Sequence, residues 1–284
     1  MRHQNHRDFK NSPMHLLAAI TAGFITLCFP ASAEKAMLRL ATTTSVDHSG
    51  LLPYLLPEFE KKHSIKLQVI AVGTGKALRL GENGDVDALL VHAPEAEREF
   101  VSKGFGKDRE EFMFNHFLIA GPKNDPARLN GCKNVKQVMK RLAAGKWVFI
   151  SRADDSGTHK KELQLWKHAE CKPEGDWYLE VGRGMGPALL MAEEKQAYIL
   201  SDLGTYLAMK RKLELAVCYE CDESMRNVYS VIVVNPARHP KVRSEAARQF
   251  ARWILSPPVQ IRIAEFKVSG ETLFQPLRLR KEDK

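Results

Sequence analysis

The chain has 284 residues, is 44% hydrophobic and carries a formal net charge of +9 at pH 7. This length predicts one or two globular domains with a sizeable core. Lys and Arg alternate with Glu and Asp along predicted helices, for example over residues 95–103, and form no basic face with interleaved aromatic residues. That pattern is typical of solvated helix faces and argues against a nucleic-acid-binding protein.

The N-terminus reads as an export signal. Basic residues precede an apolar stretch over 16–29, and small residues at 31–33 provide a signal-peptidase site. We expect residues 1–33 to be removed, with cleavage near Ala33. The alternative, a retained membrane anchor, needs nearer twenty unbroken apolar residues. A lipoprotein at Cys28 is disfavoured because Leu27 stands where a small residue is normal.

Without Cys28 the exported chain has four cysteines, which permit two disulfides in an oxidising compartment with three possible pairings. We favour Cys132 with Cys171 and Cys218 with Cys221. The Cys-x-x-Cys at 218–221 has two alternatives, a redox pair or half a zinc site. A redox pair would open a helix after a strand, and no second metal-spaced pair occurs, so a structural role is favoured and no metal-cation site is predicted.

After the leader, short β-rich runs alternate with helical patterns, which predicts an α/β protein with mainly parallel sheets. In chain order, the predicted strands are 38–42, 67–72, 88–92, 117–121, 147–150, 178–181, 197–201 and 228–234. The clearest predicted helices are 51–62, 93–103, 135–144, 159–169, 186–194, 203–210 and 242–255.

No flexible linker divides this alternation. Two apolar strands run into proline-bearing segments at 117–122 and 228–236, and each is suited to cross between lobes. We therefore predict two lobes separated by a cleft: lobe one from 34–118 and 236–284, and lobe two from 119–235.

The segment Ser151-Arg152-Ala153-Asp154-Asp155-Ser156-Gly157-Thr158-His159 lies where a predicted strand gives way to a helix. A helix start offers free N–H groups and a positive dipole end to an anion. Arg152 adds a guanidinium, Ser156 and Thr158 add hydroxyl donors, and Gly157 gives close access to the backbone. One acidic residue of the segment is expected to cap the helix.

Two other corners offer donors. Residues 42–45 hold four hydroxyl groups, of which Thr44 and Ser45 are anion-binding candidates, although Ser and Thr are also common helix caps. Gly73-Thr74-Gly75-Lys76 lacks the spacing of a nucleotide-binding P-loop, and Thr74 is either an anion donor or part of a plain turn. Donor-rich corners far apart in sequence suggest one small oxyanion held between two lobes.

Three further features allow more than one interpretation. Gly81 to Asp87 lacks the ligand pattern of a calcium loop and is expected to be a solvated loop. Arg183, in Gly182-Arg183-Gly184, is a ligand cation or a surface residue. An exported hydrolase would use Asp155 and His159 as an acid–base set, but no G-x-S-x-G or H-E-x-x-H motif accompanies them.

The sequence resembles the periplasmic tungstate-binding proteins of ABC importers across nearly the whole exported chain. The matching stretches are LATTTS at 40–45, AVGTGKAL with GENGDVDALLVHAPEAE at 71–97, SRADDSGTHKKELQLW at 151–166, GRGMGPAL at 182–189 and NPARHP at 235–240. The resemblance implies a class II periplasmic-binding fold that holds tungstate in the cleft and delivers it to ABC permease subunits. A monomeric periplasmic receptor without cofactor or enzymatic activity is expected; receptors for molybdate, sulfate or phosphate are the alternatives.

The site carried over by matched motif comprises Thr44, Ser45, Arg152, Gly157 and Thr158, with Thr74 less certain. Three positions depart from the pattern of the family. Ala153 replaces a usual glycine, Arg183 replaces a common glutamine, and Leu203 replaces a common arginine. One hypothesis is that Arg183 compensates for the arginine missing at 203.

Overall fold

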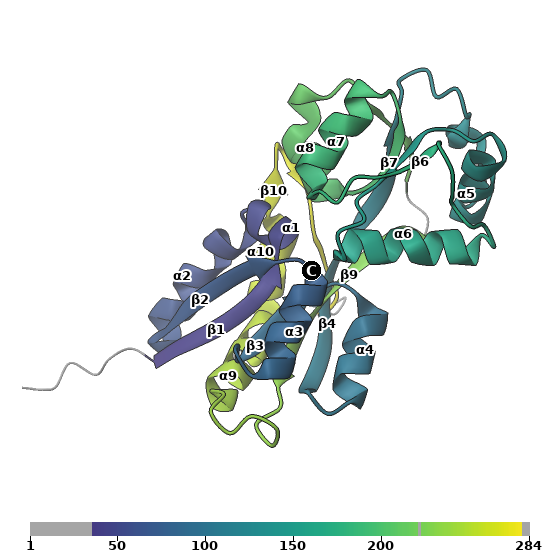
Figure 1. Cartoon of the computed structure of the whole chain (residues 1–284). Coiled ribbons are helices and arrows are strands. Elements are labelled where there is room, and N and C mark those ends of the chain that lie inside the picture. Colours follow the sequence, from purple (N-terminus) through teal and green to yellow (C-terminus); the bar gives the residue numbers. More distant parts are fainter. Residues whose placement is uncertain (1–35, 221–222, 280–284) are drawn as a thin grey trace, which may run out of the picture. The chain divides into compact units, whose positions relative to one another are not determined.

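The structure is a computed structural model that describes residues 36–220 and 223–279 (Figure 1). The expected leader, Cys28 and Cys221 lie outside the described residues. Within those two ranges, no helix combines the length and the apolar character that a membrane crossing needs.

Strands and helices alternate along most of the described chain. The strands are β1 (Ala36–Thr43), β2 (Ile65–Val72), β3 (Ala88–Val91), β4 (Gly106–Gly121), β5 (Phe149–Ser151), β6 (Tyr178–Glu180), β7 (Tyr198–Asp202), β8 (Ala216–Tyr219), β9 (Arg226–Val234), β10 (Lys267–Val268), β11 (Glu271–Thr272) and β12 (Gln275–Pro276). The α-helices are α1 (Thr44–His48), α2 (Leu51–His63), α3 (Thr74–Asn83), α4 (Pro94–Ser102), α5 (Val135–Ala144), α6 (Gly157–His168), α7 (Met185–Glu194), α8 (Leu203–Met209), α9 (Ser244–Ile254) and α10 (Pro257–Glu265). Short 3-10 helices cover Leu129–Gly131, Lys210–Lys212 and Glu223–Met225.

The strands follow the order β2-β1-β3-β9-β4-β7-β5-β6, with β8 and β12 also paired to β4. Two groups are parallel, β2-β1-β3 and β7-β5-β6. Between them β9 runs antiparallel to β3 and β4, and β4 antiparallel to β7. The fold class is confirmed: an α/β protein with mainly parallel strand groups in two lobes.

Each strand group has hydrophobic clusters on both faces. On the β1-β3-β9 group, α2, α9 and α10 contribute to one cluster, and α3 and α4 to the other. On the β5-β7 group, α5 and α6 contribute to one cluster, and α7 and α8 to the other. We call the first group with its helices and α1 lobe one, and the second group with its helices lobe two. Figure 1 shows β4 running from one to the other.

The prediction that residues 81–87 form a solvated loop is wrong, because the segment contains the end of a helix and a buried aspartate. Residues 81–83 end helix α3, and Gly81 is buried where an added Cβ would lie 2.9 Å from the Phe100 ring. Asp87 is fully buried and receives hydrogen bonds from the Arg39 side chain at 2.7 and 3.2 Å. The glycines suggested a loop, but Gly81 belongs to helix α3, where its lack of a side chain leaves room for the Phe100 ring.

The predicted Cys132–Cys171 disulfide is wrong for this structure, in which both residues are free thiols. Cys218 is likewise a free, buried thiol, and Cys221, its predicted partner, lies outside the described residues. The Cys218 thiol lies 3.7 Å from the Pro122 carbonyl oxygen, and its burial raises its pKa to about 12. A thiol with so little tendency to ionise is a poor redox nucleophile.

Candidate functional site

The lobe-one corner is the junction of β1 and α1. Thr44 and Ser45 are the first residues of α1 and are half-buried. The Ser45 hydroxyl lies 3.1 Å from the Thr43 hydroxyl and 3.4 Å from Nε2 of His92. His92 directly follows β3, which is parallel to β1, so the two strands end at the same edge of the sheet.

Thr74 starts α3 at the same edge. Its side chain is completely buried, and Oγ1 has no hydrogen-bond partner among the described residues. A buried hydroxyl without a partner is costly unless a ligand or water satisfies it. The Thr74 hydroxyl is therefore an unused donor at the sheet edge where α1 also begins.

The lobe-two corner is the loop between β5 and α6. Arg152 is buried; its guanidinium donates to Asp154 at 2.6 Å and to the Thr158 hydroxyl at 3.4 Å. Its Nε has no partner among the described residues. The cation is thus held by one carboxylate and retains a donor for a second anion.

Helix α6 is capped by a hydroxyl and not, as predicted, by an acidic residue. The Ser156 Oγ accepts from the His159 backbone N–H at 3.2 Å, while the Asp154 carboxylate bonds to Arg152. Ser side chains suit this position because a short oxygen reaches the third helical N–H. The Ser156 hydroxyl hydrogen is still able to donate to a ligand.

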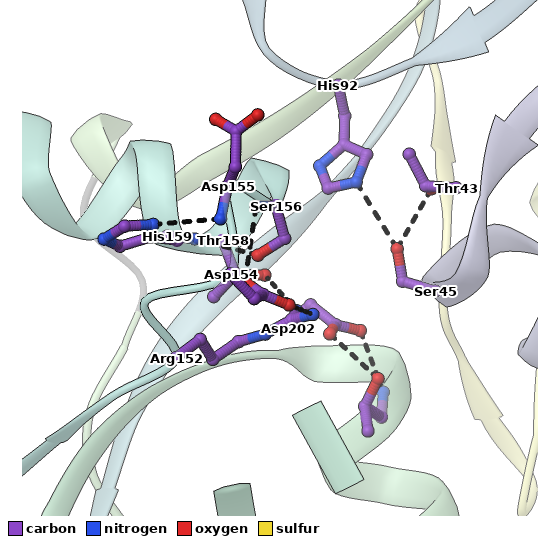
Figure 2. A network of polar contacts seen from close by, with 11 residues as sticks. Thr43, Ser45, His92, Arg152, Asp154, Asp155, Ser156, Thr158, His159 and Asp202 are labelled. Carbon is purple, nitrogen blue, oxygen red and sulfur yellow. Dashed lines mark hydrogen bonds and ion pairs between the residues drawn. The ribbon is translucent and has the colours of Figure 1, made fainter. Parts of the chain in front are cut away.

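The two corners meet at His92. An added Cβ on Gly157 would lie 2.5 Å from Cε1 of the His92 ring, so this ring lies directly against the first residue of α6. The structure thereby brings Ser45 of lobe one close to Gly157 and Thr158 of lobe two. Figure 2 shows the two groups of polar side chains facing each other.

Arg183 approaches the site only through its main chain. Its backbone N–H donates to the Arg152 carbonyl at 3.2 Å, while its side chain is exposed. Leu203 is partly buried and packs against clusters of both lobes. The arginine-to-leucine departure therefore places an apolar contact between the lobes, where it adds no donor to the site.

Asp202 is a buried acidic residue that the sequence did not suggest. It caps α8, and its two carboxylate oxygens accept from the Thr205 N–H at 2.9 Å and the Thr205 hydroxyl at 2.8 Å. Both oxygens are thus engaged by the first turn of α8.

The geometry does not favour the hydrolase alternative. The Asp155 carboxylate accepts from Lys160 at 2.5 Å, and this hydrogen bond lowers its pKa. The His159 ring contacts the backbone of Asp155: the Asp155 N–H donates to Nδ1 of His159 at 3.2 Å. No bond joins the imidazole to that carboxylate among the described residues.

A cleft of about 900 Å³ adjoins the site, with His92, Gly157 and Asn227 among its lining residues. Most of its other lining residues lie on α4, α6 and β9, and they include both basic and acidic side chains. In the described part of the chain, no cluster of three or more His, Cys, Asp or Glu residues is placed to hold a metal ion.

Sequence reasoning missed His92, Asn115 and Asn227. His92 had a usable signal, since it ends a predicted strand, and ligands bind at the carboxyl ends of parallel strands. The two asparagines lie within β4 and β9, where nothing local marks them.

Two α/β lobes whose strand-to-helix corners meet at His92 have the architecture of a two-lobed solute-binding protein. The chain belongs to the PBP superfamily, because residues 30–258 match its domain model. It is 48% identical to the tungstate-binding protein TupA of Peptoclostridium acidaminophilum, over 85% of this chain and 86% of that protein.

Two solved structures are similarly close. The tungstate-binding protein TupA from Desulfovibrio alaskensis G20 is 46% identical with a TM-score of 0.76, covering 85% of this chain and 98% of that one. The structure described as the tungstate ABC transporter from Geobacter sulfurreducens is 47% identical with a TM-score of 0.74, covering 81% and 98%.

Proposed function

We propose that this protein is an exported solute receptor that binds tungstate between its lobes and delivers it to the membrane subunits of an ABC importer. The names of its relatives support tungstate as the ligand. The observation that carries the proposal is the pair of buried, unpartnered donors, Thr74 Oγ1 and Arg152 Nε, one from each lobe. Removal of residues 1–33 on export belongs to this proposal.

The proposed ligand set consists of hydroxyl, amide and guanidinium donors. Its members are Thr44, Ser45, Thr74, Arg152, Ser156, Gly157 and Thr158. Tungstate is an unprotonated dianion at neutral pH and so needs donors only. Each charge-assisted hydrogen bond contributes on the order of 1.5 to 3 kcal/mol, so about six support nanomolar binding after the cost of closure.

We also retain the prediction of two crossings between the lobes. Residues Tyr229 and Val231 of β9 pack in a lobe-one cluster, as do Phe112 and Met113 of β4. Phe117, by contrast, packs in lobe two. These contacts support a first crossing near residue 118, as predicted, and favour a second at the beginning of β9, earlier than the predicted residue 235.

Titration calorimetry of the purified protein against tungstate, molybdate, sulfate and phosphate tests the function. We expect tungstate or molybdate to bind far more tightly than the other two anions. Arg152→Ala should weaken binding about 100-fold, since it removes a charge-assisted donor. A protein that binds none of the four anions would refute the proposal.

Arg183→Gln is the matched arginine control. The Arg183 side chain is exposed, so we expect this variant to bind within about twofold of wild type. A large loss of affinity would instead support the hypothesis that Arg183 compensates for the arginine missing at position 203.

A further inference from the structure

A chain of buried side-chain hydrogen bonds leads from the strands that join the lobes to the candidate site. Asn115 of β4 pairs in register with Asn227 of β9. The Asn227 amide nitrogen donates to Asn115 Oδ1 and to the Tyr229 hydroxyl, both at 2.8 Å. Both amide hydrogens are thus used, and Asn227 Oδ1 lies 2.8 Å from Nδ1 of His92.

This chain fixes the His92 ring. An amide oxygen only accepts, so Nδ1 of His92 donates to Asn227 and, in the neutral ring, Nε2 carries a lone pair. The Ser45 hydroxyl, 3.4 Å away, has one hydrogen, which turns either to this nitrogen or to a bound anion. Burial lowers the pKa of His92 to about 4, and the charge of Arg152 acts in the same direction, while Asp202 and the bond to Asn227 oppose it. The ring also packs on Tyr229, with centroids 4.8 Å apart.

The Cε1 side of the same His92 ring lies against lobe two. A Cβ added to Gly157 would meet Cε1 at 2.5 Å and Nδ1 at 2.8 Å, so only a residue without a side chain fits there. Gly157 is the first residue of α6, the helix whose start offers N–H groups to the anion. His92 therefore touches Ser45 in lobe one, Gly157 in lobe two and the joining strand β9.

We propose that His92 is a positioning residue that couples the strands joining the lobes to the oxyanion site. Its ring sets how closely the start of α6 approaches Ser45 when the lobes close. The contact with Asn227 ties that spacing to β9. The inference rests on the proposed function, because it describes how the same site closes on its anion.

A double-mutant cycle tests this coupling. Gly157→Ala retains the backbone N–H and adds a methyl group where the ring lies, so we expect tungstate affinity to fall at least tenfold. Alanine is favourable inside a helix, so the local fold should survive. His92→Ala should weaken binding about tenfold, because Ser45 and α6 lose their spacer. In the double variant the methyl group has room, and affinity should equal that of His92→Ala alone.

Small-angle scattering gives a second readout that local damage would not reproduce. Wild type should contract when tungstate binds, whereas Gly157→Ala should contract less at saturating tungstate. His116→Ala is the matched control. His116 follows Asn115 on β4 and is partly buried, but the chain of bonds from Asn115 to Ser45 does not include it. It should bind and contract like wild type. Thermal unfolding followed by circular dichroism confirms that each variant is folded.

Two results would overturn the inference. One is wild-type affinity and contraction in Gly157→Ala; the other is a double variant whose loss equals the product of the two single losses. A wild-type protein that binds none of the four anions refutes the proposed function itself, and the inference falls with it.

Discussion

At the residue scale, Ala153 stands in a backbone conformation that suits glycine. Its φ is +46°, in the left-handed region, where a Cβ crowds the following carbonyl. Ala153→Gly should raise the free energy of unfolding by about 1 kcal/mol, because it relieves this strain. Urea denaturation measures the change. Ala143→Gly, within helix α5, is the control and should lower stability by about 1 kcal/mol. Destabilisation by both substitutions would argue against strain at Ala153.

Glu162 predicts a pH dependence of stability. Its carboxylate is buried in α6, where it accepts from the Tyr178 hydroxyl at 2.7 Å and the Trp166 indole at 3.2 Å. Burial raises its pKa from 4.5 to about 7. The folded state then binds more protons than the unfolded state between these values, so this group's stabilisation is complete below pH 4.5 and is lost as pH rises to 7.

Glu162→Gln should remove this dependence. Between pH 4.5 and pH 8, the unfolding free energy of the wild type should fall by roughly 3 kcal/mol relative to that of the variant. Denaturant unfolding across that pH range is the measurement. Exposed Glu194→Gln, at the end of α7, is the control and should keep the wild-type slope. A difference that does not change with pH would show that Glu162 is ionised throughout.

At the element scale, Asp87 ties three segments together. It receives hydrogen bonds from the Arg39 backbone in β1 at 2.8 Å, from the Arg39 side chain and from the Arg243 backbone before α9 at 3.0 Å. The bonds from Arg39 and Arg243 overcome the effect of burial and lower the pKa of Asp87 below its usual value. Its stabilisation is therefore present at neutral pH and lost as pH falls through the lowered pKa.

Asp87→Asn should cost about 3 kcal/mol at neutral pH, which is typical of removing one partner of a buried ion pair. The exposed Asp85→Asn should change stability by less than about 0.5 kcal/mol. Chemical denaturation gives both values. Equal stability of the two variants would mean that the Asp87 contacts contribute little to the fold.

The sequence predicted the strands better than it predicted the contacts between segments far apart in the chain. Each predicted strand overlaps a strand of the structure because apolar β-rich runs are a local signal. The first part of β4, charged over 107–111, was missed: its pairing with β9 determines the conformation there. Donor corners are visible as strand-to-helix junctions, whereas the bond from His92 to Asn227 spans 135 positions and depends on topology.

At the scale of the whole molecule, polar side-chain contacts join the two lobes. The Gln164 amide of α6 donates to Glu95 of α4 at 2.8 Å, and Arg79 of α3 lies 3.5 Å from the Asp155 carboxylate. Because these contacts join different lobes, we expect them to be lost when the lobes separate. They therefore add to the apparent affinity by the free energy that they contribute to the closed state.

The hydrogen bond between Glu95 and Gln164 allows this contribution to affinity to be measured. An exposed hydrogen bond contributes roughly 0.5 to 1 kcal/mol, so Glu95→Ala or Gln164→Ala should each weaken tungstate binding about two- to fivefold. Since both variants remove the same bond, the double variant should lose no more than either one. Glu245→Ala, whose ion pairs with Arg248 and Arg252 lie within α9, should leave affinity unchanged. Calorimetry of the four variants measures the cycle, and additive losses would mean that the bond between α4 and α6 does not stabilise the closed state.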